Sequence, residues 1–135
     1  MKIYIAAPWA HRGDLPGISA QFEAAGHTVT WKWWDTPDLL ENSIWDSELM
    51  EQAFNDMKGV EDAQVLVLLN SAKSEGKAVE QGIALAHRKP VIAIGKRGGD
   101  SKNVFHYLPS YRWVDTVQDA IDVLGVVDWV VASAS

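Results

Sequence analysis

Two carboxylates, Glu80 and Asp56, are the side chains of this sequence whose types and positions suggest chemistry. Glu80 lies about one turn into a predicted helix, and Asp56 lies on the helix that precedes the predicted central strand. If they meet in the fold, one could act as a nucleophile and the other as an acid, as at glycosidic bonds. The alternative is that Glu80 only complements the dipole near the N-terminus of its helix.

The four residues Ser74-Glu75-Gly76-Lys77 open the same helix and suit an anionic ligand. Small residues at this point leave backbone amides directed outward. Together with the Ser74 hydroxyl they form a nest for a phosphate or a sugar hydroxyl. Many helices begin with Ser and Gly for capping alone, so the spacing allows both interpretations.

Aromatic residues near the first two predicted strands could complete such a site. Tyr4 lies on the first strand, where its hydroxyl could orient a carboxylate, and Trp9 lies just past that strand, where it could stack on a base. Both rings could equally belong to the core. The cluster Trp31, Trp33 and Trp34 could shape a base pocket, although alternate strand positions more often pack a core or a subunit interface.

Apolar runs typical of buried strands alternate with helical spacing along the chain, which predicts a parallel sheet covered on both faces. We expect one domain over residues 1–135, an α/β three-layer sandwich with a five-stranded parallel sheet of the flavodoxin-like or Rossmann-like type. Strands are predicted at residues 2–7, 28–34, 65–69, 90–94 and 111–114, helices at 15–25, 44–60, 77–88 and 117–124, and a loop at 35–43. Ligands bind outside the carboxyl ends of such strands, so the site should form from the loops at residues 6–14, 70–76 and 95–103.

The composition argues against several classes of protein and site. With a net charge of −6 and no basic run, the chain lacks the clustered Lys and Arg of a duplex-binding protein, so no polymeric nucleic acid is expected. It has no cysteine, and its four histidines show no metal-ligand spacing, so neither a thiolate nor a metal site is expected. The stretch Gly95–Gly99 does not match a dinucleotide fingerprint, and no cofactor is expected.

Two further features concern location. No apolar run approaches the roughly 18 residues that a membrane span needs. The start of the chain has one charge and a short apolar stretch before polar sequence, which is not typical of a signal peptide. We therefore expect a cytoplasmic protein with no membrane partner.

Taken together, the motifs resemble those of the nucleoside 2-deoxyribosyltransferase family, which includes the 2′-deoxynucleoside 5′-monophosphate N-hydrolases. The resemblance covers most of the chain, and its most specific part is Gly76-x-x-x-Glu80-x-Gly82-x-Ala84 followed by Lys89-Pro90-Val91. The opening strand Ile3-Tyr4-Ile5 and Trp9 match as well. Asp56 stands eight residues before the end of a pair that is Ala-Asp in the family, and this chain departs from it with Ala63-Gln64.

The resemblance implies a role for each of these residues. Glu80 would be the nucleophile that forms a covalent glycosyl–enzyme intermediate, Tyr4 would position it, and Asp56 would contact the base and help to protonate it. Asn103 would reach a sugar or a phosphate, often in a neighbouring subunit. The substrate contacts expected from the loops are Ala7, Trp9, Arg12, Ser74, Gly76 and Asn103.

One position separates the branches of that family. Six residues before the nucleophile, transferases of free nucleosides tend to have an Asp that holds the 5′-hydroxyl, whereas the monophosphate hydrolases tend to have a Ser, as here at Ser74. The tail Ala132-Ser133-Ala134-Ser135 also does not match the C-terminal segment that completes the transferase site. Arg12, in the first loop, could add a positive partner for a phosphate, or could simply be solvated.

The expected function is therefore that of an N-glycosidase that cleaves the base–sugar bond of a (2′-deoxy)nucleoside 5′-monophosphate. One alternative is a nucleoside 2-deoxyribosyltransferase that exchanges bases between 2′-deoxynucleosides, and another is a non-catalytic nucleotide-binding module. A homodimer or higher homo-oligomer is expected because the resemblance implies shared sites. The apolar tail from Val126 to Val131 would suit a subunit contact.

Overall fold

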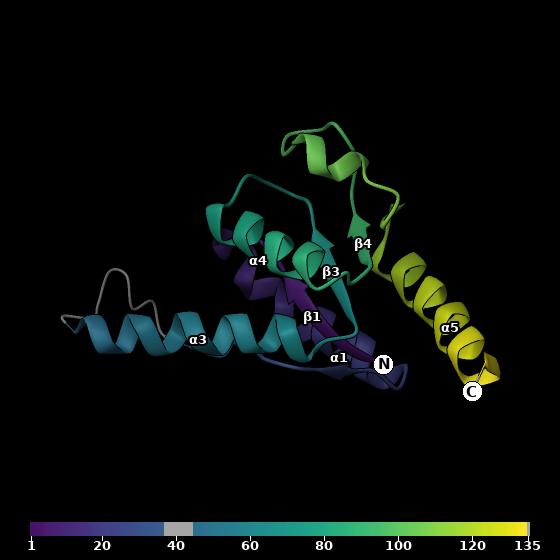
Figure 1. The fold of residues 1–135 in the computed structure, drawn as a ribbon, viewed down its shortest axis with the longest axis horizontal. Helices are drawn as coiled ribbons and strands as arrows, with labels where there is room; N and C mark the ends of the chain where they lie inside the picture. The colour runs from purple at the N-terminus through teal and green to yellow at the C-terminus, as the bar shows by residue number, and fades with distance from the viewer. Residues whose placement is uncertain (37–44, 135) are drawn as a thin grey trace.

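Five parallel strands form one sheet, in the order β2–β1–β3–β4–β5, within the residues that the computed structural model describes, 1–36 and 45–134 (Figure 1). The strands are β1 (Lys2–Ala6), β2 (Thr28–Val29), β3 (Val65–Leu69), β4 (Val91–Ile94) and β5 (Tyr111–Val114). The parallel sheet confirms the predicted α/β class. The predicted loop at 35–43 falls largely outside the described residues.

Helices cover both faces of this sheet. The described ranges contain α1 (Leu15–Ala24), α3 (Asp46–Asp62), α4 (Glu75–Ala86) and α5 (Val117–Ala134), with the 3-10 turns η1 (Trp9–Asp14), η2 (Trp33–Asp35) and η3 (Val104–Tyr107). Right-handed crossovers place α1, which leads outward from β1 to β2, on one face, and α3 and α4, which lead back to β3 and β4, on the other. The three-layer arrangement is therefore the predicted one.

The core lies around β1 and β3, which pair with each other in the middle of the sheet. Every residue of β3 is buried, and so is every residue of β1 after Lys2. A continuous apolar run such as Val-Leu-Val-Leu-Leu is typical of a parallel strand that is covered on both faces. The helices α3 and α4 pack beside each other on one face, and Figure 1 shows that α3 extends well past the strands at its N-terminal end.

The second strand is shorter than predicted, and that part of the prediction was wrong. Only Thr28 and Val29 pair with β1, and the chain leaves the sheet before its tryptophans. The indole N–H of Trp33 donates to the carbonyl oxygen of Ile5 at 2.7 Å, which fixes the ring over the end of β1. The aromatic content that indicated a longer strand therefore serves packing against the sheet.

The last helix is longer than predicted. It continues to Ala134, although Gly125 was expected to end it near residue 124. A glycine inside a helix costs only about 1 kcal/mol relative to alanine, so the helix tolerates it. The apolar segment Val126 to Val131, expected as a tail, is therefore part of α5.

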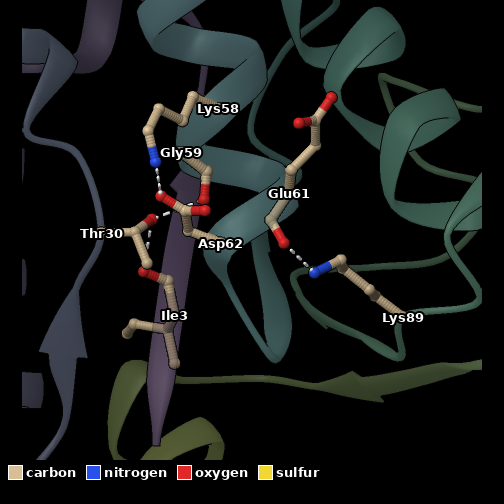
Figure 2. A network of polar contacts seen from close by, with 7 residues as sticks. All are labelled: Ile3, Thr30, Lys58, Gly59, Glu61, Asp62 and Lys89. Carbon is tan, nitrogen blue, oxygen red and sulfur yellow. Dashed lines mark hydrogen bonds and ion pairs between the residues drawn. The ribbon is translucent and has the colours of Figure 1, made fainter.

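The C-terminal end of α3 is hydrogen-bonded to residues that flank β2 and β4 (Figure 2). The hydroxyl oxygen of Thr30 lies 2.7 Å from the carbonyl oxygen of Gly59 and 3.3 Å from that of Ile3, so its one proton goes mainly to Gly59. The ammonium of Lys89 donates to the carbonyl oxygen of Glu61. These bonds satisfy carbonyl groups that the end of a helix leaves without an intrahelical partner.

Gly59 allows α3 to approach the sheet closely. A Cβ at this position would lie 2.8 Å from the Cβ of Trp31 and 2.9 Å from the ring of Tyr4. Non-bonded carbon atoms in proteins essentially never approach each other this closely. Neither the Cβ of Trp31 nor the ring of Tyr4 is the free end of a flexible side chain, so neither could move away easily. The glycine therefore sets the distance between the helix and the first strand.

Replacing Gly59 by alanine should destabilise the protein. Overpacking at a buried contact typically costs about 1–3 kcal/mol, which exceeds the helix propensity that alanine gains. The free energy of unfolding, measured by denaturant titration, should fall by that amount. Gly17→Ala is the matched control, because Gly17 is also helical but has nothing within 4 Å of an added Cβ. Equal stability changes in the two variants would contradict the packing argument.

Candidate active site

A cavity of about 610 Å³ opens at the carboxyl ends of the strands, on the face of the sheet that α3 and α4 cover. Its walls come from the first loop with Ala7 and Trp9, from α3 with Asp56, and from the start of α4 with Ser74 and beyond. Two of the three loops expected to build the site, at 6–14 and 70–76, line this cavity. The third, at 95–103, does not contribute a residue to this cavity.

A hydrogen bond between Tyr4 and Glu80 joins the central sheet to α4 at the cavity. The ring of Tyr4 is completely buried, and its hydroxyl donates to Oε2 of Glu80, a residue 76 positions later in the chain. Glu80 itself lines the cavity. The tyrosine is thus a core ring and also the partner of the carboxyl group, so the two interpretations of Tyr4 hold together.

The surroundings of Glu80 disfavour the charged form of its carboxyl group. The pKa of its carboxyl group is raised to about 8: burial is the largest cause, the hydrogen bond from Tyr4 acts against it, and the neighbouring Asp56 adds to the rise. Burial, with the two nearby carboxylates, raises the pKa of the Tyr4 hydroxyl, which remains a donor. A carboxyl group with a strongly shifted pKa in a cavity is a candidate for function on physical grounds.

Asp56 lines the same cavity from α3. The indole N–H of Trp31 donates to its Oδ1 at 3.0 Å. Burial raises the pKa of Asp56, while that hydrogen bond lowers it. The structure therefore brings together the two carboxyl groups that the sequence places on separate helices, and each has an aromatic donor of its own.

The first turn of α4 supplies the polar end of the cavity. The helix begins at Glu75, two residues earlier than predicted, and Ser74 is its N-cap. The hydroxyl oxygen of Ser74 accepts the backbone N–H of Lys77 at 3.2 Å, and both Ser74 and Gly76 line the cavity. Capping and a place in the cavity are thus compatible, because Ser74 does both.

Two indole rings form the apolar wall. The rings of Trp9 and Trp33 lie 5.9 Å apart with an interplanar angle of 31°, and both line the cavity together with Ala7. Arg12 lies outside this lining. Its guanidinium carbon lies 4.5 Å from the centre of the Trp9 ring, and its Nη1 donates to the carbonyl oxygen of Trp9 at 3.1 Å.

Asn103 is not brought to this cavity by its own chain. Its Oδ1 accepts the backbone N–H of Phe105 at 2.9 Å, so the side chain caps η3. Its Nδ2 lies 3.2 Å from Nε2 of His106. The residue is exposed, and so are Val104 and Phe105 beside it.

The sequence interpretation missed three polar residues or rings with a place at the site. Trp31 was considered only as part of an aromatic cluster, whereas it binds Asp56 directly. Gln52 and Lys77 line the cavity as well. A helical signal was available for both, because Gln52 precedes Asp56 by four positions and Lys77 precedes Glu80 by three, which puts each pair on one helix face.

Within residues 1–36 and 45–134 no three histidine, aspartate or glutamate side chains gather in a way that could hold a metal ion. In the same part of the chain, no helix has both the length and the apolar character needed to cross a membrane.

The comparisons with known proteins identify the fold. No protein-family model matches the chain, and the curated proteins give no significant match. A conserved protein from Enterococcus faecalis V583 aligns with a TM-score of 0.66 at 18% identity, covering 90% of this chain and 95% of that one. The Clostridium botulinum CMP N-glycosidase BcmB aligns with a TM-score of 0.59 at 14% identity, covering 93% and 98% respectively. At such identities the likeness shows a shared Rossmann-like α/β fold.

The variant Glu80→Gln should be more stable than the unsubstituted protein at high pH. The folded protein holds the Glu80 proton up to a pKa of about 8, whereas the unfolded chain releases it near 4.5, so the folding contribution of Glu80 is lost as pH rises between these values. Glutamine does not ionise. Unfolding free energies should therefore differ by at least about 1 kcal/mol near pH 9 and converge near pH 4.

Glu75→Gln is the control for that experiment, because it removes an exposed carboxylate from the same helix. A stability difference for Glu80→Gln that is the same at both pH values would show that burial does not hold the proton on this group.

Proposed function

We propose that this protein is an N-glycosidase that cleaves the base–sugar bond of a (2′-deoxy)nucleoside 5′-monophosphate through a covalent glycosyl–Glu80 intermediate. The observation that supports it most is the pairing of a tyrosine-bound carboxyl group, Glu80, with a second carboxyl group, Asp56, in one cavity. Reactions at a glycosidic carbon need a group that attacks the sugar and an acid that assists the leaving base.

In the first step, an oxygen of the Glu80 carboxylate bonds to C1′ of the sugar, and the bond between C1′ and the base nitrogen breaks. The electron pair of that bond stays with the base, which takes a proton from Asp56. In the second step, water bonds to C1′ and gives a proton to the Asp56 carboxylate, and Glu80 leaves as a carboxylate. The products are the free base and the sugar 5-phosphate.

When the substrate is bound, the two carboxyl groups must therefore carry one proton, and it must lie on Asp56. In the free protein Glu80 holds a proton at neutral pH because its pKa is about 8, so that proton has to pass to Asp56 before the attack. Burial raises the pKa of both, and the charge of Asp56 raises that of Glu80, so the loss of one proton opposes the loss of the other. The donor hydrogen bond from Tyr4 favours the charge on Glu80, as a nucleophile requires. Trp31 occupies Oδ1 of Asp56, which leaves Oδ2 to carry the proton to the base.

The cavity walls support a nucleotide as substrate. The tilted rings of Trp9 and Trp33 offer an apolar surface for a base, as in other base-stacking sites. Ser74, Gly76 and the backbone amides at the start of α4 offer a place for the 5′-phosphate. The fold shared with a CMP N-glycosidase, at 14% identity, is consistent with this class of substrate.

A homodimer or higher homo-oligomer is part of the same proposal. Asn103 caps η3 and precedes the exposed residues Val104 and Phe105, which are 79% and 57% accessible. A neighbouring subunit that covered these two residues with the rim of its own cavity would bring Asn103 to that cavity. The cytoplasmic location expected from the sequence likewise stays a proposal.

The reaction can be tested by incubating the protein with each of the four 2′-deoxynucleoside 5′-monophosphates and following the release of free base by chromatography. Release without an acceptor supports a hydrolase. Product that forms only when a second base is supplied would identify a transferase instead. Tight binding without product over hours would identify a nucleotide-binding module and contradict the proposal.

Replacement of Glu80 by glutamine or alanine should abolish turnover and leave the fold intact. Loss of a covalent nucleophile should lower kcat by at least about 10³-fold, while the circular dichroism spectrum should not change. Glu75→Gln, on the exposed side of the same helix, should retain full activity. Full activity in Glu80→Gln would remove the nucleophile from the proposal.

Replacement of Ser74 by aspartate should weaken use of monophosphates more than use of nucleosides. Aspartate is as good an N-cap as serine, so α4 should be preserved. Its charge would repel a 5′-phosphate, and kcat/KM for the monophosphate should fall by about tenfold or more relative to that for the nucleoside. Equal effects on the two substrates would show that the phosphate does not bind at Ser74.

A further inference from the structure

Lys77 places a buried ammonium group at the start of α4. The side chain is only 2% exposed. Its Nζ lies 3.2 Å from Oδ1 of Asn70, 2.5 Å from the carbonyl oxygen of Ala72 and 3.2 Å from Oγ of Ser101. Three acceptor oxygens match the three protons of an ammonium ion, so the group is fully hydrogen-bonded in its charged form.

These contacts join two loops at the carboxyl edge of the sheet. Asn70 and Ala72 follow β3, whereas Ser101 follows β4, and Nδ2 of Asn70 also donates to the carbonyl oxygen of Ser101 at 2.9 Å. Asn70 and Ser101 are each 7% exposed. Lys77 therefore holds the loop that carries Ser74 in a fixed place.

The charge of Lys77 has no acidic counterpart. All three of its hydrogen-bond acceptors are uncharged, and within residues 1–36 and 45–134 no carboxylate forms an ion pair with it. An uncompensated buried charge is costly, and burial lowers the pKa of Lys77 to about 8. At neutral pH most of the group is still protonated, so the fold maintains a buried positive charge that no carboxylate of the described residues pairs with.

The residues that line the cavity indicate a role for the charge of Lys77. Lys77 is the one basic residue of the cavity lining within the described residues, and the ionisable groups with it are Asp56 and Glu80. The two carboxyl groups share one proton in the proposed reaction, so a phosphate that entered this cavity, in a chain of net charge −6, would meet one carboxylate charge. Coulomb repulsion in a partly buried site is strong, so a nearby positive charge would have a large effect on such a ligand.

We propose that Lys77 is a specificity-determining residue whose buried charge, held beside Ser74 and Gly76, makes the cavity select 5′-phosphorylated ligands over unphosphorylated nucleosides. This inference rests on the proposed function and adds a source of substrate selection to it. The protons of Lys77 are already engaged by three oxygens, so the side chain acts through its charge and through the loop that it holds. The phosphate itself is bound by Ser74 and the amides.

Binding measured in a Glu80→Gln background tests this role without turnover. Affinities for 2′-deoxynucleoside 5′-monophosphates and for the matching nucleosides should be measured by calorimetry, with and without Lys77→Gln. We expect Lys77→Gln to weaken monophosphate binding by about tenfold or more and nucleoside binding by less than about twofold. Lys73→Gln is the matched control, because it removes an exposed lysine from the same loop and should change neither affinity.

Two further variants separate charge from folding. Lys77→Arg keeps the charge and should retain the preference for the monophosphate. Lys77→Met replaces the buried charge with an apolar chain of similar length, a change that proteins often accept, and should lose the preference even if Lys77→Gln does not fold. Equal weakening of both ligands, or an unchanged ratio in the neutral variants, would overturn the inference.

The assay also distinguishes this inference from the proposed reaction. If the unsubstituted protein releases no base, the proposed function fails, while the ratio of affinities in the Glu80→Gln background still decides the role of Lys77. If the cavity with Lys77 intact binds monophosphate and nucleoside equally, the inference fails although the N-glycosidase reaction can stand.

Discussion

The hydrogen bond from Tyr4 to Glu80 is the contact on which the rest of the site depends. It joins the first strand to a helix that is 76 residues away in sequence, and it directs the carboxyl group of that helix into the cavity. Its geometry in turn depends on Gly59, because any larger side chain there would collide with the Tyr4 ring. The orientation of Glu80 therefore depends on how closely α3 packs on the sheet.

The same burial that builds the core sets the chemistry of the cavity. The carboxyl groups of Glu80 and Asp56 lose contact with water in this cavity, which favours their protonated forms. Hydrogen bonds from Tyr4 to Glu80 and from Trp31 to Asp56 partly stabilise the charged forms. Lys77 shows the opposite case, in which burial favours the neutral amine and three oxygens stabilise the ammonium. Such groups lower the stability of a fold, and proteins retain them chiefly at functional sites.

Much of the fold was predictable because its signals are local. The strands at 65–69 and 111–114 have the predicted bounds. The first is a continuous apolar run, and the second has the aromatic and β-branched residues that favour strands, Tyr111, Trp113 and Val114. The strand predicted at 28–34 was wrong after Val29. β-strand propensity does not distinguish a tryptophan that belongs to a strand from one that lies outside the sheet and donates its indole N–H to a strand carbonyl, as Trp33 does to Ile5.

By itself, the sequence determined the residue types, the capping segment around Ser74 and Gly76, and the motif around Glu80, because these depend on neighbours within one or two helical turns. The first residue of that helix was predicted two positions too late. Only the tertiary structure decided which of those residues meet. It brought Asp56 and Tyr4 to Glu80, left Asn103 outside the cavity of its own chain, and turned Lys77 inward onto Asn70 and Ser101. The physical reason is that desolvation and charge coupling arise between residues far apart in the chain, and the crossovers of the sheet set those distances.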